Sequence, residues 1–440
     1  MHKLLKLSAF SLMTALAFVA CEEETTDEAA STTPIVSDTV IVGPFTSRVE
    51  LSASKTYLLK GFASVEDGGE LVIPAGTKVV GDFVSRGTLI VKRGGKLTVN
   101  GTETNPVVFT SQRAAGSKAR GDWGGIIING RSTNNLPGGI GTSEGNGGTF
   151  GGGASPNSAD NSGSIRYLRI EFGGTKVSPD NEVNGLTLNS VGSGTTIEYV
   201  QTHFIADDGF EWFGGTVNAK YLVSSGNDDD SFDIDNGFTG KLQFIYAIQD
   251  PALANRGHEV DNDSKGSSAT PLTMPTIYNA TIVGATTGTP SSVKANDDDN
   301  DGLYFRRNSA GKMYNYIVTN FRGYGFNIDG TGSVNKAKRD SLFVKNSILF
   351  NNKFGANKGG YEVSFKGDTT GVAALLTAWG VKVQDPQLGS LTFESNNPVP
   401  AATVTGATPP SDGFFTTSAT YIGAFGTTNW TSNWTNFAKK

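Results

Sequence analysis

Two phrases of the sequence combine carboxylates with aromatic residues in almost the same order. The first, "DDGFEWFGG", covers residues 207–215, and the second, "DDSFDIDNG", covers residues 229–237. Successive side chains of a β-strand point to opposite faces, so Phe210 and Phe232 point one way and the carboxylates that follow them, Glu211 and Asp233, point the other. Carboxylates gathered on one face can hold a metal ion or carry out acid-base chemistry. Either chemistry requires an element that stacks the two phrases.

An internal repeat with a step near 23 residues supplies that element. The steps between equivalent positions are 24, 22, 26, 45 and 23 residues, and we interpret the step of 45 as two turns of chain, with a strand at 277–284 in the gap. Short β-type segments, Gly/Asn turns and the absence of intervening helical patterns predict a right-handed parallel β-helix. A β-propeller is the competing all-β architecture, but its blades need about 40 residues each. The equivalent positions are Leu186, Phe210, Phe232, His258, Leu303 and Phe326.

The predicted fold class is therefore all-β: a single-stranded right-handed parallel β-helix, a pectin-lyase-like solenoid with loop insertions and a small C-terminal cap. The 57 glycines fit a chain with many tight turns. Apolar residues at helical spacing occur in "TTGVAALLTAWGVK", and Trp430 and Trp434 are expected to pack in the cap. The expected boundaries are 46–365 for the β-helix, with insertions near 131–163, 263–276 and 285–301, and 366–440 for the C-terminal helix and aromatic cap.

The N-terminus has the features of an export signal. Two lysines precede an apolar run, and the run ends in "AFVAC", so residues 1–20 are predicted to be a lipoprotein signal peptide and Cys21 the acylated residue. An ordinary cleaved signal with a chance cysteine is the alternative. Residues 21–45 begin with an acidic, Thr/Ser-rich stretch that cannot bury enough surface to fold, which predicts a flexible tether. Acidic residues directly after the cysteine favour an outer-membrane lipoprotein exposed on the cell surface, although a plain soluble spacer has the same composition.

The net charge of the chain limits the classes of partner that it is expected to bind. The formal charge is −6, which argues against nucleic acid and favours cations. Beyond the signal region, no stretch has the length and hydropathy of a membrane span, so a channel or transporter is not expected. The predicted membrane partner acts only through the lipid anchor.

The repeat predicts a ladder of carboxylates. Stacking the phrases places Glu211, Asp233 and Glu259 in one outward column on coils about 4.8 Å apart, with Asp235 and Asp261 in the next column. Like charges at that spacing repel each other, and Ca²⁺, which accepts six to eight oxygens, would compensate them. A solvated acidic stripe without metal is the alternative, because Asp and Asn are also good turn formers. Further ligand-binding candidates are Asp207, Asp208, Asp229, Asp230 and Arg306.

Catalysis by the same face is a separate possibility. Parallel β-helix enzymes that cut acidic polysaccharides use aspartate clusters, or a calcium ion with a basic residue that removes a proton. The register places His258 in the inward column, which predicts a buried histidine and not a base. Arg256 and Arg306 are the candidate bases, and an arginine within hydrogen-bond reach of the carboxylates would favour an enzyme. No nucleophile constellation is present, so we assign no catalytic residue.

Several longer phrases resemble a known family. They include "GDWGGIIINGR" at 121–131, "DDGFEWFGGTVNAKYLVSSGNDDDSFDID" at 207–235 and "YIGAFGTTNWTSNWTNF" at 421–437. The chain is similar to a family of Bacteroidota surface lipoproteins with a right-handed β-helix, whose members often carry the label "multidrug transporter". The resemblance implies a surface lipoprotein, and it carries no catalytic residues over to this chain. The transporter label conflicts with the lack of a spanning segment.

These observations predict a lipid-anchored cell-surface β-helix that binds Ca²⁺ together with a carbohydrate or a partner protein, without turnover. An accessory role beside an outer-membrane uptake protein fits such a molecule by analogy with other surface lipoproteins. One alternative is a polysaccharide lyase or glycoside hydrolase that acts on an acidic glycan. A second alternative is an adhesin or structural surface protein, which would present a long flat face without a cleft.

Overall fold

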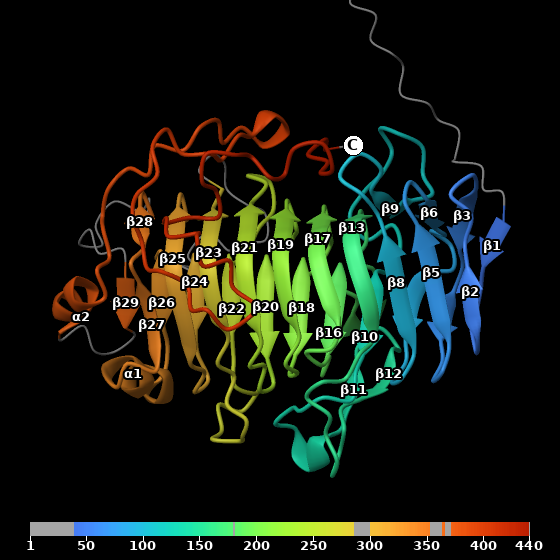
Figure 1. Ribbon diagram of the computed structural model, residues 1–440, viewed down its shortest axis with the longest axis horizontal. Helices are drawn as coiled ribbons and strands as arrows, with labels where there is room; N and C mark the ends of the chain where they lie inside the picture. The colour runs from blue at the N-terminus through green and yellow to red at the C-terminus, as the bar shows by residue number, and fades with distance from the viewer. Residues whose placement is uncertain (1–38, 179–180, 286–299, 353–362, 366–370, 440) are drawn as a thin grey trace, which may run out of the picture.

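The chain winds into a parallel β-helix in a computed structural model that describes residues 39–178, 181–285, 300–352, 363–365 and 371–439 (Figure 1). The first strand begins at Thr39, so the solenoid starts within the stretch expected to be a tether, before residue 46. The predicted signal peptide, Cys21 and most of the third insertion lie outside the described residues. The predicted all-β solenoid is confirmed by the two long parallel sheets that follow.

Sheet A contains 15 strands and sheet B contains ten. Along its main path sheet A holds β1 (Thr39–Ile41), β3 (Thr56–Leu59), β6 (Lys78–Gly81), β9 (Val107–Ser111), β13 (Gly163–Glu171), β17 (Thr196–His203), β19 (Asn218–Ser225), β21 (Lys241–Ile248), β23 (Thr276–Val283), β25 (Gly311–Thr319) and β27 (Leu342–Lys345). Its remaining strands are β2 (Arg48–Glu50), β5 (Glu70–Pro74), β8 (Lys96–Asn100) and β28 (Ile348–Phe350).

Sheet B carries the short strands that lie between successive strands of sheet A. They are β4 (Phe62–Val65), β7 (Thr88–Val91), β10 (Ile126–Asn129), β16 (Leu186–Asn189), β18 (Phe210–Phe213), β20 (Phe232–Asp235), β22 (His258–Val260), β24 (Leu303–Phe305), β26 (Phe326–Ile328) and β29 (Val363–Phe365). Two antiparallel pairs are β11 (Gly141–Ser143) with β12 (Gly148–Phe150) and β14 (Lys176–Ser178) with β15 (Asn181–Glu182). The helices are α1 (Thr331–Lys338) and α2 (Val372–Ala378), with 3₁₀ turns η1 (Pro137–Gly139) and η2 (Phe393–Ser395).

The register of sheet B is the one that the repeat predicts. Phe210 pairs with Phe232, Phe232 with His258, and His258 with Leu303. All four side chains are buried in the interior column. A glycine before the strand allows the coils to approach closely: a Cβ on Gly257 would lie 2.4 Å from the Gly302 carbonyl oxygen.

The interpretation of the 45-residue step as two coils was wrong. Because His258 pairs directly with Leu303, the step is a single coil that carries two insertions. The first insertion lies between β22 and β23, and the second lies between β23 and β24. The strand predicted at 277–284 corresponds to β23, which belongs to this same coil in sheet A.

The insertion at 131–163 contains strands, contrary to the expectation of a plain loop. β11 and β12 pair as a hairpin, which protrudes below the sheets in Figure 1. Its glycine-rich sequence has little strand propensity, but tertiary contacts hold the hairpin. The Asn189 side chain donates to Ser143 Oγ at 2.8 Å, and Phe150 is buried.

An aromatic ladder follows the outside of sheet A where its long strands bend. Tyr167, Tyr199, Tyr221 and Phe244 occupy equivalent positions, and each has a positive φ of 50° to 58°. Bulky residues rarely adopt this backbone conformation. The rings stack with centroids 4.3, 4.2 and 4.8 Å apart, so favourable ring contacts offset the strain.

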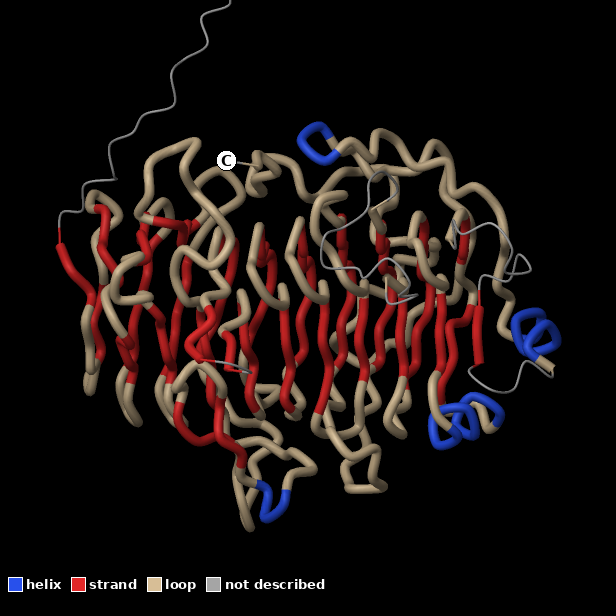
Figure 2. The backbone as a smooth tube through the Cα atoms, turned by 180° about the vertical axis from the view of Figure 1, so that it is seen from behind, coloured by secondary structure: helices blue, strands red, loops and turns tan. Residues whose placement is uncertain are grey.

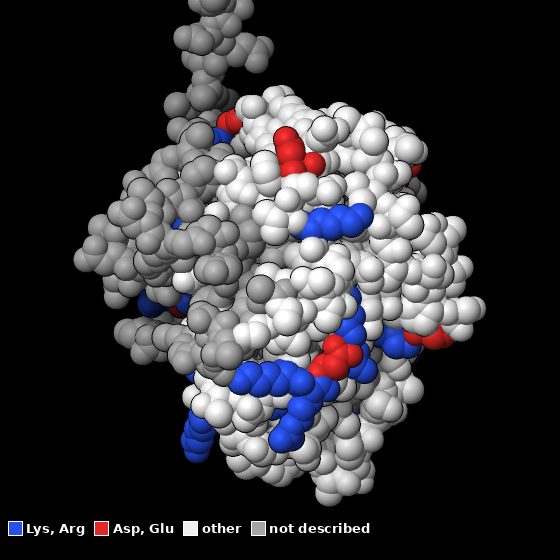
Figure 3. All heavy atoms as spheres, turned by 90° about the vertical axis from the view of Figure 1, so that its left-hand side faces the viewer, with Lys and Arg blue, Asp and Glu red and all other residues white. Residues whose placement is uncertain are grey.

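The C-terminal region has two parts and only one covers an end of the solenoid. Trp379, at the end of α2, packs against Phe326 and Phe365 in the last coils. Figure 3 views this end and shows Lys and Arg side chains mainly over its lower half. The residues that follow, 383–439, run back along the side of the solenoid and form a strap (Figures 1 and 2).

The strap corrects the expectation of an aromatic end cap. Trp434 is fully buried and meets Tyr167 and Tyr199 edge-on, with ring centroids 5.9 Å apart in both pairs. Side chains of sheet A also fasten the strap, since Asn279 Nδ2 donates to the Tyr421 carbonyl oxygen at 2.7 Å. The predicted packing role of the tryptophans is confirmed, but they seal the side of the solenoid. None of the helices in the described part of the chain is long and apolar enough to cross a membrane.

Replacing Trp434 with alanine is expected to lower the free energy of unfolding by about 3–5 kcal/mol, the usual cost of removing a buried tryptophan. The variant loses the edge-on contacts to the aromatic ladder and leaves a cavity under the strap. Urea unfolding followed by circular dichroism measures the change. Val84→Ala, at a side chain that is 88% exposed, is the control and should cost little. Equal stability of both variants would show that the strap contributes nothing to the fold.

Candidate functional site

The candidate site lies on the outer face of sheet B, across β18, β20, β22 and β24. Glu211 pairs with Asp233 and Asp233 with Glu259, so the predicted outward column exists in the predicted register. As expected, these carboxylates point away from the core. They are nevertheless largely shielded from solvent, which the sequence did not predict. Glu211 is 7% exposed and Glu259 is 6% exposed.

Six carboxylates form what we name the acidic cluster: Asp207, Asp208, Glu211, Asp229, Asp230 and Asp233. They assemble in overlapping groups, each with ligand atoms within 4.8 Å of one another. One group joins Asp208, Glu211 and Asp233, and a second joins Asp207, Asp208 and Asp229. A third group adds Glu259 to Asp230 and Asp233. Within the described part of the chain, the buried Oδ1 atom of Asp233 has no hydrogen-bond partner.

The turns before the strands position two members of the acidic cluster. Asp208 Oδ1 accepts a hydrogen bond from the backbone N–H of Asp230 at 2.8 Å, and Asp230 Oδ1 accepts one from the N–H of Arg256 at 2.6 Å. Asn184 is the equivalent residue one coil earlier. Its Oδ1 accepts a hydrogen bond from the backbone N–H of Asp208, and its Nδ2 donates to Glu211. Each turn side chain thus fixes the next coil with one oxygen. The second oxygen of Asp230 lies 3.8 Å from Arg256 Nη1, so the turn also joins the acidic cluster to an arginine.

Burial and mutual repulsion raise the pKa values of five carboxylates of the acidic cluster, namely Asp207, Asp208, Glu211, Asp230 and Asp233. Burial, followed by the charge of Asp233, raises the pKa of Asp208 and Glu211 well above the usual range. Burial and the neighbouring Asp229 raise the pKa of Asp207 to about 9 and that of Asp230 to about 7. Without a counter-charge, several of these groups are therefore protonated at neutral pH.

Arginines balance the charge at the other half of the site. Arg306 contacts Glu259 and places its Nε 2.9 Å from Asp261 Oδ1. Arg256 contacts Glu259 as well, and Arg307 Nη1 lies 2.7 Å from Asp261 Oδ2. We name Arg256, Arg306 and Arg307 the arginine group.

The geometry separates the residues predicted to bind metal. Glu211 and Asp233 belong to the acidic cluster, and Asp261 is paired with arginines. Glu259 does both, since it lies within one carboxylate group and contacts Arg306. Asp235 belongs to none of the three carboxylate groups, and its Oδ1 accepts a hydrogen bond from the N–H of Asn236 at 2.6 Å. The turn residues proposed as further ligands lie beside the column, and Arg306 joins the arginine group.

The two histidines outside the N-terminal region play no part in the site. His258 is fully buried, stacks on Phe232 with ring centroids 5.1 Å apart, and has its pKa lowered to about 3 by burial. The prediction of a buried histidine is confirmed. His203 is also buried, and its Nε2 lies 2.8 Å from the Ala438 carbonyl oxygen in the strap.

Sequence reasoning missed the roles of Asn184 and Tyr304. Asn184 precedes the glycine of "NGLTLN", the position that Asp208 occupies in "DGFEWF", so the repeat alignment contained the signal. Tyr304 continues the outward column after Glu259, and its ring lies 4.7 Å from the Arg256 guanidinium carbon. Aromatic contact of this kind holds a guanidinium in place.

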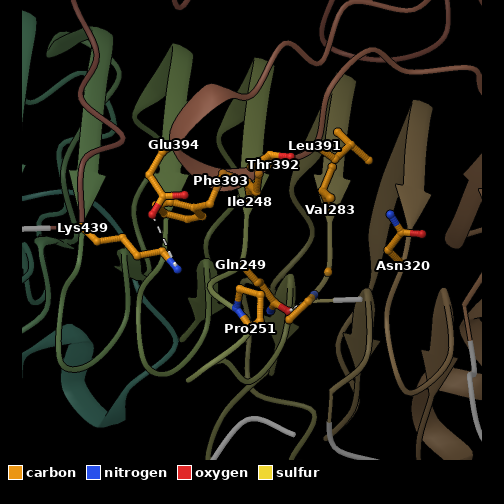
Figure 4. Close-up of a pocket in the computed structure, with 12 residues that line it drawn as sticks. Ile248, Gln249, Pro251, Val283, Asn320, Leu391, Thr392, Phe393, Glu394 and Lys439 are labelled. Carbon is orange, nitrogen blue, oxygen red and sulfur yellow. Dashed lines mark hydrogen bonds and ion pairs between the residues drawn. The ribbon is translucent and has the colours of Figure 1, made fainter. Parts of the chain in front are cut away.

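Two pockets border the β-helix, one beside the candidate site and one under the strap. One, of about 360 Å³, lies between the hairpin insertion and sheet B and includes Glu144, Phe213 and Asn236. The other, of about 430 Å³, lies under the strap (Figure 4). Its charged groups are already paired, since Lys439 Nζ is 3.8 Å from Glu394 and 3.3 Å from Asp250. The second pocket is therefore a seam between the strap and the coils.

Comparison with known proteins gives one family. A family model described as "Pectate-lyase like beta helix domain" matches residues 43–385, more than half of the chain. No curated protein and no solved structure is similar enough to match. The matched range includes the acidic cluster and the arginine group and ends at the start of the strap.

The raised pKa values predict that the metal-free protein loses stability as the pH rises. An acid with a higher pKa in the folded state binds more protons when folded, so its stabilisation is present at low pH and lost through the folded pKa. In a chelating buffer, the unfolding temperature should fall between about pH 4 and about pH 9, the range set by Asp230 and Asp207.

Scanning calorimetry across that range measures the decline. Asp207→Asn with Asp230→Asn should flatten it, because the amides cannot ionise and the new amide oxygen at position 230 would still accept from the Arg256 N–H. Asp385→Asn, at an exposed position, is the matched control. An unfolding temperature that is constant or rises with pH would contradict the raised pKa values.

Proposed function

Because this chain belongs to the pectate-lyase-like β-helix domain family, we propose that sheet B binds a calcium ion in its acidic cluster and an acidic glycan beside that ion. The observation that carries the proposal is the overlap of three carboxylate groups with ligand atoms within 4.8 Å of one another. Repulsion and burial oppose such an arrangement unless a cation or protons compensate.

The donor set fits a hard cation. The acidic cluster offers only carboxylate oxygens, which suit Ca²⁺, Mg²⁺ and Mn²⁺ and do not select zinc or copper. Ca²⁺ accepts six to eight oxygens in irregular geometry, whereas Mg²⁺ requires a tight octahedron. Asp208, Glu211 and Asp233 would hold the ion, and the unpartnered Asp233 Oδ1 supports this assignment.

The arginine group supports the choice of an anionic glycan. Arg307 is 42% exposed and Arg306 is 23% exposed, so N–H donors of both face outward beside the cluster. A guanidinium matches the geometry of a sugar carboxylate. A calcium ion supplies a second positive centre for the same carboxylates. Binding without turnover is our primary proposal, with Cys21 as the lipid anchor that holds the protein at the outer-membrane surface beside an uptake partner.

A polysaccharide lyase is the second candidate, and the position of Arg306 favours it. Its guanidinium contacts the carboxylates, and burial, followed by the charges of Arg307 and Arg256, lowers the pKa of Arg306 to about 10. A deprotonated Arg306 would take the proton next to the sugar carboxyl group. A carbon–carbon double bond then forms as the glycosidic carbon–oxygen bond breaks, and the leaving oxygen takes a proton from solvent.

Calorimetric titration with Ca²⁺ is expected to show saturable binding that Asp233→Asn with Glu211→Gln weakens roughly 100-fold, because two charged ligands are lost. Glu50→Gln, on an exposed side chain of β2 outside the three carboxylate groups, is the control and should bind as the unmodified protein does. Equal affinity in the double variant, or no binding at all, would refute the calcium site.

Titration with polygalacturonate in calcium and in chelator then tests the glycan. Calcium is expected to add a component of binding that is absent in chelator, and Arg307→Ala should weaken that component. If a product with the ultraviolet absorbance of an unsaturated sugar forms, the protein is a lyase, and the proposal of binding without turnover is wrong. Calcium binding without any response to the polymer would favour an adhesin or structural surface protein.

A further inference from the structure

A groove of about 960 Å³ lies away from the acidic cluster, at the ends of β4, β7 and β10. Residues that directly follow these strands form its floor, and the hairpin insertion forms one wall. Its volume lies within the range of small-ligand sites. The lining residues are Glu66, Asp67, Lys92, Arg93, Arg131, Gly148, Thr149, Gly151, Gly152, Ser155 and Asn157.

Three cationic side chains in the groove are held by backbone carbonyl groups. Lys92 Nζ donates to the Gly147 carbonyl oxygen at 2.8 Å, and Arg93 Nη1 donates to that of Gly151 at 3.1 Å. Arg131 Nη2 donates to the Arg93 carbonyl oxygen at 3.2 Å. These bonds fix the positions of the charges and use only some of the donors that an ammonium or guanidinium group carries.

The acidic residues of the groove do not neutralise all of this charge. Asp67 is paired with Arg131 at 2.5 Å, and Glu66 accepts a hydrogen bond from Ser64 Oγ. Among the described residues, Lys92 and Arg93 form no ion pair. The three cations and two carboxylates of the groove leave one net positive charge, and two fixed cations that form no ion pair mark a place for an oxyanion. The arginine group on sheet B differs, because all three of its members are paired with carboxylates.

The wall of the groove suits a sugar. Gly148 has a φ of +92°, and a Cβ there would lie 2.8 Å from Lys92 Nζ, so glycine lets the ammonium group approach the hairpin. Beyond it, Thr149, Ser155 and Asn157 are exposed and offer hydroxyl and amide groups. Such groups hydrogen-bond to sugar hydroxyls, while the cations take a charged substituent.

We infer that this groove binds an anionic saccharide, with a carboxylate or sulfate group on Lys92 and Arg93. The inference is independent of the proposed calcium site, since the groove presents cations and needs no metal. Binding here should therefore persist in chelator, whereas binding at the acidic cluster should not.

The test is calorimetric titration in chelator with two probes, a galacturonate disaccharide and a sulfated disaccharide. At least one probe is expected to bind, which identifies the preferred anion, and Lys92→Gln with Arg93→Gln should weaken that binding at least tenfold. Lys382→Gln, an exposed lysine near the opposite end of the solenoid, controls for the loss of positive charge. Failure of both probes to bind, or equal binding by the double variant, would overturn the inference.

A second variant keeps the test valid if the double variant unfolds. Thr149→Trp leaves both cations in place and fills the groove from an exposed strand position, where an aromatic residue is tolerated. It should block the saccharide while circular dichroism and the unfolding temperature stay unchanged. Unimpaired binding by this variant would place the ligand elsewhere.

Discussion

The in-register stacking of sheet B is the constraint on which the site depends. Parallel pairing places equivalent residues of successive coils about 4.8 Å apart, whatever their chemistry. Inside the solenoid this is favourable, and Phe210 stacks on Phe232 with centroids 5.5 Å apart. Outside, the same register places Glu211 beside Asp233 and Asp233 beside Glu259, where like charges repel. The site is therefore defined by how this repulsion is balanced.

Two kinds of balance occur along one column. At β22 and β24 the chain supplies its own counter-charge, because Arg256 and Arg306 contact Glu259. At β18 and β20 the described residues supply hydrogen bonds from Asn184 and the turns, but no comparable set of cations. Protons or a metal ion must therefore compensate the negative charge of the carboxylates at β18 and β20. A protonated cluster and a metal-filled cluster would differ in their dependence on pH and on calcium, which makes the two states separable.

Much of the solenoid could be predicted because its signals are local. Alternation within "FEWF" and "FDID", together with a step of 22 residues, was enough to place the two columns. The pairing of Arg306 with Glu259 was hidden because two insertions separate them along the chain. The hairpin at 131–163 depends on contacts such as Asn189 with Ser143, and its own sequence favours turns. The path of the strap likewise depends on distant partners, including Asn279 and the aromatic ladder.

The most direct measurement is anomalous diffraction from crystals of the protein soaked in Mn²⁺, which takes the same carboxylate ligands as Ca²⁺ and can be located by its scattering. A cation held by the carboxylate column predicts a peak about 2–2.6 Å from Asp233 Oδ1 and from an oxygen of Asp208 or Glu211. Peaks confined to exposed carboxylates such as Asp385, with none at Asp233, would contradict it and leave the acidic cluster as a set of buried, protonated side chains.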